Sequence, residues 1–241
     1  MDAEPRYERL TIVMPVYNEA ATLRTALERL LAVDMPLPSE VVIVDDGSTD
    51  GCTDLIADLV DDERVRLIRQ VPNQGKGAAL VRGFDEARGD LLTILDADLE
   101  YDPGDIPTLC APALSGEATV VYGARSYGGH AAYSFWFVLG NKAVALWASM
   151  LFDAWITDVE TCLKLAPTAT WREVGITSSG FGIEAELTGK LLARGERIFE
   201  VPISYRARGR EDGKKIQWTD GIEALWILLR IRLRTLGRRR R

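Results

Sequence analysis

The sequence predicts an α/β fold in which a mostly parallel sheet is flanked by helices. Three segments support this prediction, residues 10–19, 40–50 and 91–102, because each runs from an apolar strand into a polar turn. Residues 41–44 are four consecutive β-branched apolar residues, which is typical of a strand buried on both faces of a parallel sheet. A chain of 241 residues suits a single α/β domain and is long enough to bury a sizeable core.

The first of these segments ends in polar side chains. Its strand is followed by Tyr17, Asn18 and Glu19, and a helix is expected from about residue 20 to residue 31. In open parallel sheets, ligands bind outside the carboxyl ends of the strands. These side chains are therefore candidates for a ligand-binding crevice.

The second segment ends in a pair of carboxylates. Asp45 and Asp46 follow the buried strand and precede a glycine turn. Ser48 or Thr49 is expected to cap a helix that follows, because both residue types accept hydrogen bonds from the first turn of a helix. We expect this strand end to face the same crevice as the first.

The third segment is the most informative part of the chain. Asp96 and Asp98 follow an apolar strand, and Glu100 lies two residues further on. Because alternate residues of an extended chain share one side, we expect the three carboxylates to converge at the strand end. Such hard oxygen ligands suit Mg²⁺ or Mn²⁺. A single Asp-x-Asp is more often a helix cap or an Asx turn, but the second acidic strand end upstream favours a metal site.

The overall composition argues against several other classes of function. The three cysteines are scattered, odd in number and without metal-ligand spacing, which suits a reducing compartment and no disulfide framework. The only histidine, His130, lies in a Gly-Gly-His-Ala stretch that reads as surface loop, so histidine-based nucleophilic catalysis is poorly supported. The charged N-terminal residues contain no signal-peptide core.

The charge is unevenly distributed along the chain. The net charge is −7, but residues 203–241 carry 12 Lys and Arg against 4 Asp and Glu. An apolar helix around Trp226 leads into seven arginines. This combination suits a membrane surface, where apolar burial and attraction to anionic lipid add together. Nucleic acid is the weaker interpretation of the tail, because basic stripes interleaved with aromatic residues are missing elsewhere.

A second apolar segment covers residues 131–152. It is long enough to span a bilayer, but Lys142 interrupts it near the middle, where a charge is costly. Two alternatives remain, a buried helix or an interfacial helix with Phe135, Trp136 and Trp147 in lipid.

Eight short motifs occur in order along the chain, and each is weak alone but the ordered set is specific: residues 15–19, 44–48, 73–77, 96–98, 122–125, 158–164, 180–184 and 200–205. The first four resemble motifs of the inverting family 2 glycosyltransferases of the GT-A fold. The last four resemble the polyprenyl-phosphate branch of that family, which includes the dolichyl-phosphate mannose synthases. The resemblance covers about residues 10–230 and favours the interfacial helix over 131–152.

The resemblance implies a Rossmann-like, mostly parallel sheet with C-terminal interfacial helices. A catalytic domain would cover residues 1–210, and residues 211–241 would add an acceptor loop, an amphipathic helix and a basic tail without forming a separate domain. The implied reaction is metal-dependent transfer of a sugar from a UDP- or GDP-sugar to a polyprenyl phosphate. The protein would act as a peripheral protein on the cytoplasmic face of a membrane, with a membrane-protein partner or as a homo-oligomer.

The resemblance also assigns roles on the donor side. By this resemblance, the residues that bind the base and ribose of the donor are Pro15, Tyr17, Glu19, Val44 and Asp46. Strand packing is the alternative role for Pro15 and Val44. Asp96 and Ala97 match positions near the nucleoside and diphosphate. Asp98 is the principal metal ligand, with Glu100 and Asp96 beside it. Residues 75–77 read as a close-packed turn before a helix, with Lys76 as a phosphate candidate.

On the acceptor side, the resemblance assigns cations to the lipid phosphate. Arg125, Arg208 and Lys215 match the phosphate-binding positions of the family, and arginine gives bidentate contacts there. The loop over 206–215 is two residues longer than the family pattern and lacks its serine, so Lys214 competes with Lys215 for the role. Tyr133 replaces a basic residue that is common in the mannose synthases. A solvated basic loop is the alternative interpretation.

Two other functions remain as alternatives. The first is a soluble transferase acting on a sugar or protein hydroxyl, which needs a general base; Asp158, Glu160 and Glu184 are the candidates. The second is a non-catalytic module that binds nucleotide sugars, which the presence of Asp96, Asp98, Arg125 and Arg208 disfavours.

Overall fold

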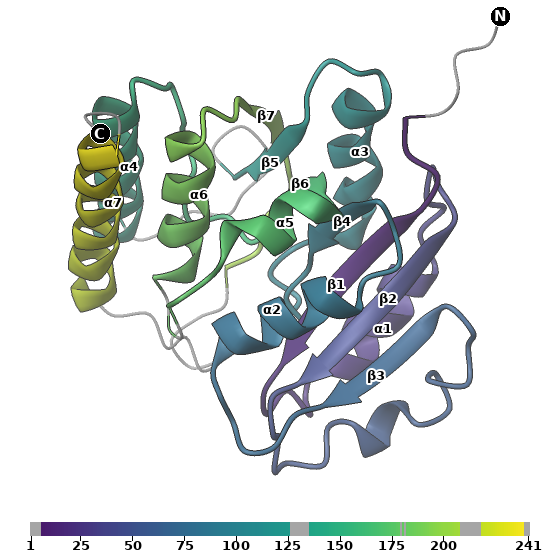
Figure 1. Cartoon of the computed structure of the whole chain (residues 1–241). Coiled ribbons are helices and arrows are strands. Elements are labelled where there is room, and N and C mark those ends of the chain that lie inside the picture. The colour runs from purple at the N-terminus through teal and green to yellow at the C-terminus, as the bar shows by residue number, and fades with distance from the viewer. Residues whose placement is uncertain (1–5, 126–134, 179, 181, 208–217, 239–241) are drawn as a thin grey trace, which may run out of the picture.

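The computed structural model describes residues 6–125, 135–178, 180, 182–207 and 218–238 (Figure 1). Within these residues the chain forms an α/β fold, which confirms the predicted class. The strands are β1 (Leu10–Val16), β2 (Ser39–Asp45), β3 (Val65–Arg69), β4 (Leu91–Ile94), β5 (Val120–Ala124), β6 (Lys164–Pro167) and β7 (Ile198–Pro202). The helices are α1 (Leu23–Leu31), α2 (Lys76–Glu86), α3 (Ile106–Leu114), α4 (Phe135–Phe152), α5 (Thr168–Val174), α6 (Ile183–Ala193) and α7 (Trp218–Arg238), with short 3₁₀ turns η1 (Asp54–Ile56) and η2 (Pro103–Asp105).

The strands form one sheet in the order β3-β2-β1-β4-β6-β5-β7. β1 pairs in parallel with β2 and with β4, and β2 pairs in parallel with β3. β6 runs antiparallel to both of its neighbours, β4 and β5. Because β1, β2 and β4 run in the same direction, their carboxyl ends lie at one edge of the sheet. The polar residues that directly follow these three strands therefore lie along the same edge.

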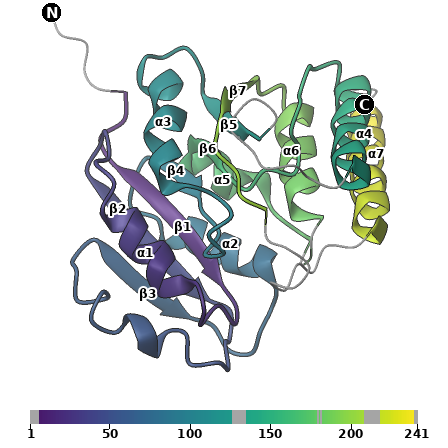
Figure 2. The same cartoon turned by 180° about the vertical axis from the view of Figure 1, so that it is seen from behind.

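Helices cover both faces of the sheet. α2 and α5 lie over one face (Figure 1), and α1 and α3 lie over the other (Figure 2). β1 and β2 are almost entirely buried, which explains their near-continuous apolar sequences, because a parallel strand covered on both faces needs no polar alternation.

The helix expected after Ser48 or Thr49 is absent from the described structure. Residues 46–53 form an irregular loop that leads into η1. The Ser48 backbone N–H donates to the Asp45 side chain at 2.9 Å, and the Ser48 hydroxyl accepts from the Asn18 N–H at 3.0 Å. Ser48 therefore joins the turns after β1 and β2 instead of capping a helix.

The predicted close-packed turn over residues 75–77 is confirmed. Gly75 has a φ of +92°, a conformation that favours glycine. A Cβ atom added to Gly77 would lie 2.0 Å from the carbonyl oxygen of Ser178. The start of α2 therefore packs directly on the backbone of Ser178 and on the side chain of Ile176.

The predicted apolar helix over 131–152 is described from Phe135 onward, as α4. α4 and α7 lie side by side at one end of the molecule in both views (Figures 1 and 2). Val144, Ala145 and Ala148 of α4 are buried, whereas Phe135 and Trp136 are 68% and 76% exposed. The prediction of a buried helix therefore fits the face that carries Val144, Ala145 and Ala148. The prediction of an interfacial helix fits the exposed residues Phe135 and Trp136. Trp147 is half-buried and donates its indole N–H to the carbonyl of Leu225 in α7, so its ring is not fully available to lipid. None of the described helices combines the length and apolar character needed to cross a membrane.

Candidate functional site

A cavity of about 340 Å³ lies at the carboxyl ends of β1, β2 and β4. It brings together polar groups from the three strand ends and from the start of α2. Its lining residues are Pro15, Val16, Tyr17, Glu19, Asp46, Asn73, Gly75, Lys76, Ala79, Asp96, Ala97, Asp98 and Gly180. Seven residues to which the resemblance assigns the nucleotide or the metal line this cavity, and so does the phosphate candidate Lys76.

The β1 end contributes an exposed aromatic side chain. Tyr17 is 42% exposed at the rim of the cavity, which leaves its ring free to stack on a flat ligand. Asn18 has a φ of +56°, and its side-chain oxygen accepts from the Thr49 N–H at 2.8 Å. This bond fixes the turn that carries Tyr17 and Glu19.

The β2 end contributes Asp46, which is almost fully buried. Its carboxylate accepts from the backbone N–H groups of Gln74 at 2.8 Å and Gly75 at 2.7 Å, and from the side-chain amide of Gln70. Asp46 thus holds the loop before α2 against the cavity. Val44 is fully buried in β2 and does not line the cavity, so strand packing describes its surroundings.

The β4 end departs from the predicted geometry. We expected Asp96, Asp98 and Glu100 to converge on an extended backbone, but β4 ends at Ile94 and Leu99 adopts a φ of +62°. Asp98 accepts from the Glu100 N–H at 3.0 Å, forming the Asx turn that was the alternative interpretation. Because Leu99 reverses the chain, Asp98 lines the cavity described above, whereas Glu100 lines a neighbouring one of about 530 Å³.

The carboxylates of the cavity still suit a divalent cation. Across the described residues, no group of three or more His, Cys, Asp or Glu side chains is placed to hold a metal ion. Asp96 and Asp98, however, both line the same cavity. Mg²⁺ is commonly bound through one or two carboxylates together with substrate phosphates and water. This pair therefore fits such an ion in the company of a diphosphate.

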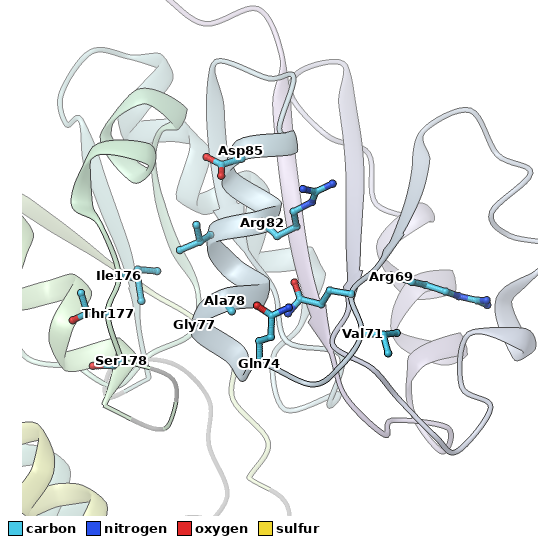
Figure 3. A pocket seen from close by; sticks show the side chains of 12 residues that line it. Arg69, Val71, Gln74, Gly77, Ala78, Arg82, Asp85, Ile176, Thr177 and Ser178 are labelled. Atoms are coloured by element: carbon cyan, nitrogen blue, oxygen red, sulfur yellow. The ribbon is translucent and has the colours of Figure 1, made fainter.

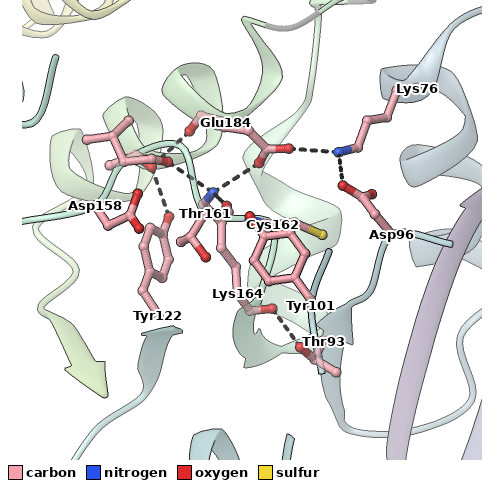
Figure 4. Close-up of polar contacts among 12 residues, drawn as sticks. Lys76, Thr93, Asp96, Tyr101, Tyr122, Asp158, Thr161, Cys162, Lys164 and Glu184 are labelled. Atoms are coloured by element: carbon pink, nitrogen blue, oxygen red, sulfur yellow. Dashed lines mark hydrogen bonds and ion pairs between the residues drawn. The ribbon is translucent and has the colours of Figure 1, made fainter. Parts of the chain in front are cut away.

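A chain of charged side chains extends from Asp96 and Lys76, which are partly exposed at the cavity, to Glu184 and Lys164, which are buried (Figure 4). Lys76 Nζ lies 2.9 Å from Asp96 Oδ2 and 3.0 Å from Glu184 Oε1. The other oxygen of Glu184 lies 3.0 Å from Nζ of Lys164, a fully buried lysine that also donates to the carbonyls of Val159 and Thr161. Burial alone would raise the pKa of Glu184, but the two lysines outweigh it and lower that pKa to about 2.

Sequence analysis missed the Lys164–Glu184 pair. Both residues lie within quoted motifs, but spacing along the chain gives no sign that β6 and α6 meet. The available signal was a single lysine in an otherwise apolar strand, since a buried lysine requires a partner.

Arg125 follows β5 and forms a second charge pair. Its Nε and a terminal nitrogen donate to the two oxygens of Asp158 at 2.8 and 2.7 Å, and its backbone N–H donates to the same carboxylate. The guanidinium also lies over the ring of Tyr205, 4.9 Å from its centre. The Tyr205 hydroxyl donates to Glu100 at 2.6 Å. Arg125 is therefore linked through Tyr205 to the end of β4.

The residues discussed for the acceptor side that lie outside the described residues are Arg208, Lys214, Lys215 and Tyr133. His130, placed in a surface loop by the sequence, also lies outside them. The described start of this loop lies at the neighbouring cavity, because the Arg206 N–H donates to the Glu100 carbonyl at 2.9 Å and both residues line that cavity.

A larger cavity of about 690 Å³ lies on the far side of α2. Its lining includes Arg69, Gln74, Arg82, Asp85 and Ser178 (Figure 3). It contains none of the predicted site residues. Because the acidic ends of β2 and β4 lie at the smaller cavity, we assign the functional site there.

Comparisons with known proteins agree with this assignment. Residues 11–158 match the family model described as glycosyl transferase family 2. An undecaprenyl-phosphate mannosyltransferase of Micrococcus luteus is 29% identical, with 93% of this chain and 99% of that protein aligned. A dolichol-phosphate mannosyltransferase of Pyrococcus furiosus is 26% identical, with 86% of this chain and 59% of that protein aligned.

Other relatives are aligned over only part of their length. An undecaprenyl-phosphate 4-deoxy-4-formamido-L-arabinose transferase of Aeromonas hydrophila is 42% identical over 111 residues, which are 44% of this chain and 34% of that protein. A hexosyltransferase of low-salt glycan biosynthesis from Haloferax volcanii is aligned over 49% of its length. The chain thus spans half or less of the length of these curated relatives.

Among solved structures, the fold is similar to that of glucosyl-3-phosphoglycerate synthase from Mycobacterium tuberculosis, crystallised with Mn²⁺, UDP and glucosyl-3-phosphoglycerate. The TM-score is 0.69 at 22% identity, with 93% of this chain and 80% of that chain covered. This likeness supports the GT-A fold.

Proposed function

The chain belongs to glycosyl transferase family 2, and on this basis we propose that it transfers a sugar from a nucleoside diphosphate sugar to a polyprenyl phosphate at a membrane surface. The observation that carries the proposal is the cavity at the ends of β1, β2 and β4, with the carboxylates of Asp96 and Asp98 in its wall. The names of the aligned relatives, mannosyltransferases of undecaprenyl and dolichol phosphate, support the acceptor class.

The donor nucleotide is proposed to bind between the β1 and β4 ends. Tyr17 offers a ring for the base, and Glu19 and Asp46 offer oxygens for ribose hydroxyls. Lys76, at the first position of α2, adds a positive charge beside Asp96. Together with the start of that helix, this charge favours a diphosphate on the cavity side.

A divalent cation, Mg²⁺ or Mn²⁺, held by Asp96 and Asp98 would offset the charge on the leaving diphosphate. Glu100 remains a candidate for that role only if the turn at Leu99 rearranges, because it lines the neighbouring cavity.

The acceptor requires little acid–base chemistry. A phosphate monoester is largely ionised at neutral pH, since its second pKa is about 6. Once oriented, it can attack the anomeric carbon and expel the nucleoside diphosphate, with the phosphate oxygen forming the new bond. The task of the protein is then to position the two anions and offset their repulsion. We assign this task to Arg125, with Arg208 and Lys215 as sequence-based partners.

Membrane attachment is proposed to involve the exposed apolar faces of α4 and α7. Phe135, Trp136 and Met150 are exposed on α4, and Ile222 and Trp226 are exposed on α7. The C-terminal half of α7 carries arginines at positions 230, 232 and 234. Basic residues near an anionic surface each contribute about 1 kcal/mol to binding.

The experiment is a screen of radiolabelled UDP- and GDP-sugars against polyprenyl phosphate, scored by label in organic-extractable lipid. We expect one sugar to be transferred to the phosphorylated lipid and none to the free polyprenol. Equal transfer to an unphosphorylated sugar would contradict the proposed acceptor.

A further inference from the structure

Glu184 contacts two lysines but does not line the proposed donor cavity. Its side chain is 11% exposed, with one oxygen 3.0 Å from Lys76 Nζ and the other 3.0 Å from Lys164 Nζ. The residues that form the wall of the cavity include Lys76 but not Glu184. Any effect of Glu184 on a ligand in the cavity is therefore exerted through Lys76.

Lys164 is the fixed end of this arrangement. It is fully buried, and its ammonium group donates to the carbonyls of Val159 and Thr161 as well as to Glu184. Because a lysine has three N–H donors, each of them has a partner within the protein. The ammonium group also lies 4.9 Å from the centre of the Tyr122 ring. Lys164 thus holds one oxygen of Glu184 in a defined position.

Lys76 is the end that reaches the cavity. Its side chain is 32% exposed, and its ammonium group donates to Asp96 at 2.9 Å and to Glu184 at 3.0 Å (Figure 4). Among the residues that the structure describes, these two carboxylates are its only hydrogen-bond partners. One of its three N–H donors therefore remains for a ligand in the cavity.

The four side chains are balanced in charge without a ligand. Two lysines face two carboxylates, and the Lys76 ammonium group lies between Asp96 and Glu184. A divalent cation bound to Asp96, as proposed above, would compete with Lys76 for that carboxylate. Glu184 is then the partner that Lys76 keeps, because Glu184 is itself held by the buried Lys164.

We propose that Glu184, anchored by Lys164, is a positioning residue that holds the Lys76 ammonium group in place for the diphosphate of the donor. This inference rests on the proposed function, because it concerns the donor site. A long side chain that must be ordered when a ligand binds lowers the affinity for that ligand. With Glu184 in place, Lys76 is already ordered in the free protein.

The first test removes the anchoring pair without changing the charge of the site. Lys164→Met with Glu184→Leu, called the pair variant, replaces a buried ion pair by apolar residues, which is often neutral or stabilising. Isothermal titration calorimetry with UDP and with GDP, with and without Mn²⁺, compares it with the parent. Because the net charge is the same, charge alone predicts the parental affinity. We expect about five-fold weaker binding, as for one lysine that must be ordered on binding.

A second variant answers the same question if the pair variant fails to fold. Glu184→Gln removes one negative charge near the bound diphosphate, which by itself would strengthen the binding of an anion. Positioning of Lys76 predicts the opposite sign, so we expect weaker binding of UDP and GDP. The sign of the change therefore separates positioning from charge.

A double-mutant cycle tests whether Glu184 acts through Lys76. Lys76→Met alone should weaken binding of the nucleoside diphosphate about ten-fold or more, which is typical for loss of a hydrogen bond to a charged group. Adding the pair substitutions, or Glu184→Gln, to Lys76→Met should cause no further loss, because no ammonium group remains to be positioned. An equal loss in both backgrounds would mean that Glu184 acts by another route and would overturn the inference.

Glu40→Gln is the matched control. Glu40 is a buried glutamate that pairs with Arg66 at 3.4 Å, but it lies at the start of β2, at the opposite end of that strand from the cavity. Its replacement should lower the melting temperature and leave the affinity for UDP and GDP unchanged. A comparable loss of nucleotide affinity in the control would point to general destabilisation and would overturn the positioning role.

The outcomes distinguish this inference from the proposed function. Parental affinity for UDP and GDP in the pair variant, or in Glu184→Gln where that variant is used, overturns the positioning role and leaves the proposed function standing. If the parent binds UDP or GDP but transfers no sugar to polyprenyl phosphate, the proposed acceptor falls, while calorimetry still decides the role of Glu184. If the parent binds neither nucleotide, both proposals fall.

Discussion

The ammonium group of Lys76 lies 2.9 Å from a carboxylate oxygen of Asp96. The same group lies 3.0 Å from Glu184, so one cation joins the end of β4 to the start of α6. Asp96 therefore has a positively charged partner within the protein, and any divalent cation that binds Asp96 must share it with Lys76.

Replacing Lys76 should strengthen binding of a metal ion. We expect Lys76→Met to raise the affinity for Mn²⁺ about ten-fold without nucleotide, because a cation a few ångströms from the ligand no longer repels the ion. Calorimetric titration measures this change. Lys190→Met serves as the control, since Lys190 pairs with Glu186 away from the cavity. An unchanged affinity in Lys76→Met would mean that Asp96 does not bind the metal.

The Glu184 bridge should make stability depend on acid pH. The pKa of Glu184 is about 2 in the folded protein against an ordinary value of 4.5. A carboxyl whose pKa falls on folding stabilises the protein above its unfolded pKa, and this contribution disappears as the pH falls through the folded value. The contribution is on the order of 3 kcal/mol. Urea unfolding of the parent and Glu184→Gln at several pH values measures it.

The parent should therefore lose more stability than Glu184→Gln between about pH 4.5 and pH 2. Glu63→Gln, which alters an exposed carboxyl, should follow the parent curve. Parallel curves for the parent and Glu184→Gln would exclude the bridge as a source of stability.

Asp98 provides a prediction about the metal itself. Asp98→Asn retains an oxygen that can accept from the Glu100 N–H, so the turn should persist while the ligand charge is lost. We expect sugar transfer to fall at least about a hundred-fold, in line with loss of a charge-stabilising group, with little change in melting temperature. Activity assays across a Mn²⁺ series give the result. Full activity of the parent in excess chelator would rule out the metal role.

Arg125 should affect the acceptor more than the donor. Arg125→Lys loses the two-pronged contact with Asp158, and a lysine restores the charge without the fork. We expect the KM for polyprenyl phosphate to rise about ten-fold, corresponding to about 1.4 kcal/mol, while donor affinity changes little. Steady-state kinetics with each substrate varied in turn measure both. Loss of donor binding, with an unchanged KM for polyprenyl phosphate, would mean that Arg125 acts on the donor and not on the acceptor.

The exposed apolar faces of α4 and α7 should determine membrane binding. Trp136→Ser with Trp226→Ser should reduce co-flotation with vesicles rich in anionic lipid, because both side chains are more than 60% exposed and lose apolar burial in the interface. Removal of residues 230–241 should reduce flotation further at low salt. This additional loss should shrink at high salt, because salt screens the attraction of the arginines to anionic lipid in the parent. Val71→Ser is the control, since Val71 is 81% exposed near the far cavity. Equal flotation of all variants would exclude this face as the anchor.

The sequence predicted the parts of the site that depend on whole strands. β1, β2 and β4 could be recognised from their apolar runs, and parallel pairing then required their polar ends to share one edge. The residues around Tyr17, Asp46 and Asp98 were located in this way. The geometry inside the turns was less predictable, because it depends on single backbone angles.

Two particular residues illustrate that limit. Leu99 takes a left-handed conformation that is rare for a leucine, and this one angle sends Glu100 to a different cavity from Asp98. Ser48 bonds across to Asn18, a contact between residues far apart in the chain that local capping rules do not consider. The Lys164–Glu184 pair was not predicted for a similar reason, because Lys164 belongs to β6 and Glu184 to α6.

The antiparallel strand β6 has a consequence for synthesis on the ribosome. β6 pairs with β4 on one side and with β5 on the other, so these two strands have no connection through the sheet until residues 164–167 have emerged. A nascent chain that stops earlier would leave the apolar strand β4 with an open edge, and such edges promote aggregation. Fragments ending before β6 should therefore be poorly soluble, although they contain β1, β2, β4 and every carboxylate that lines the proposed site.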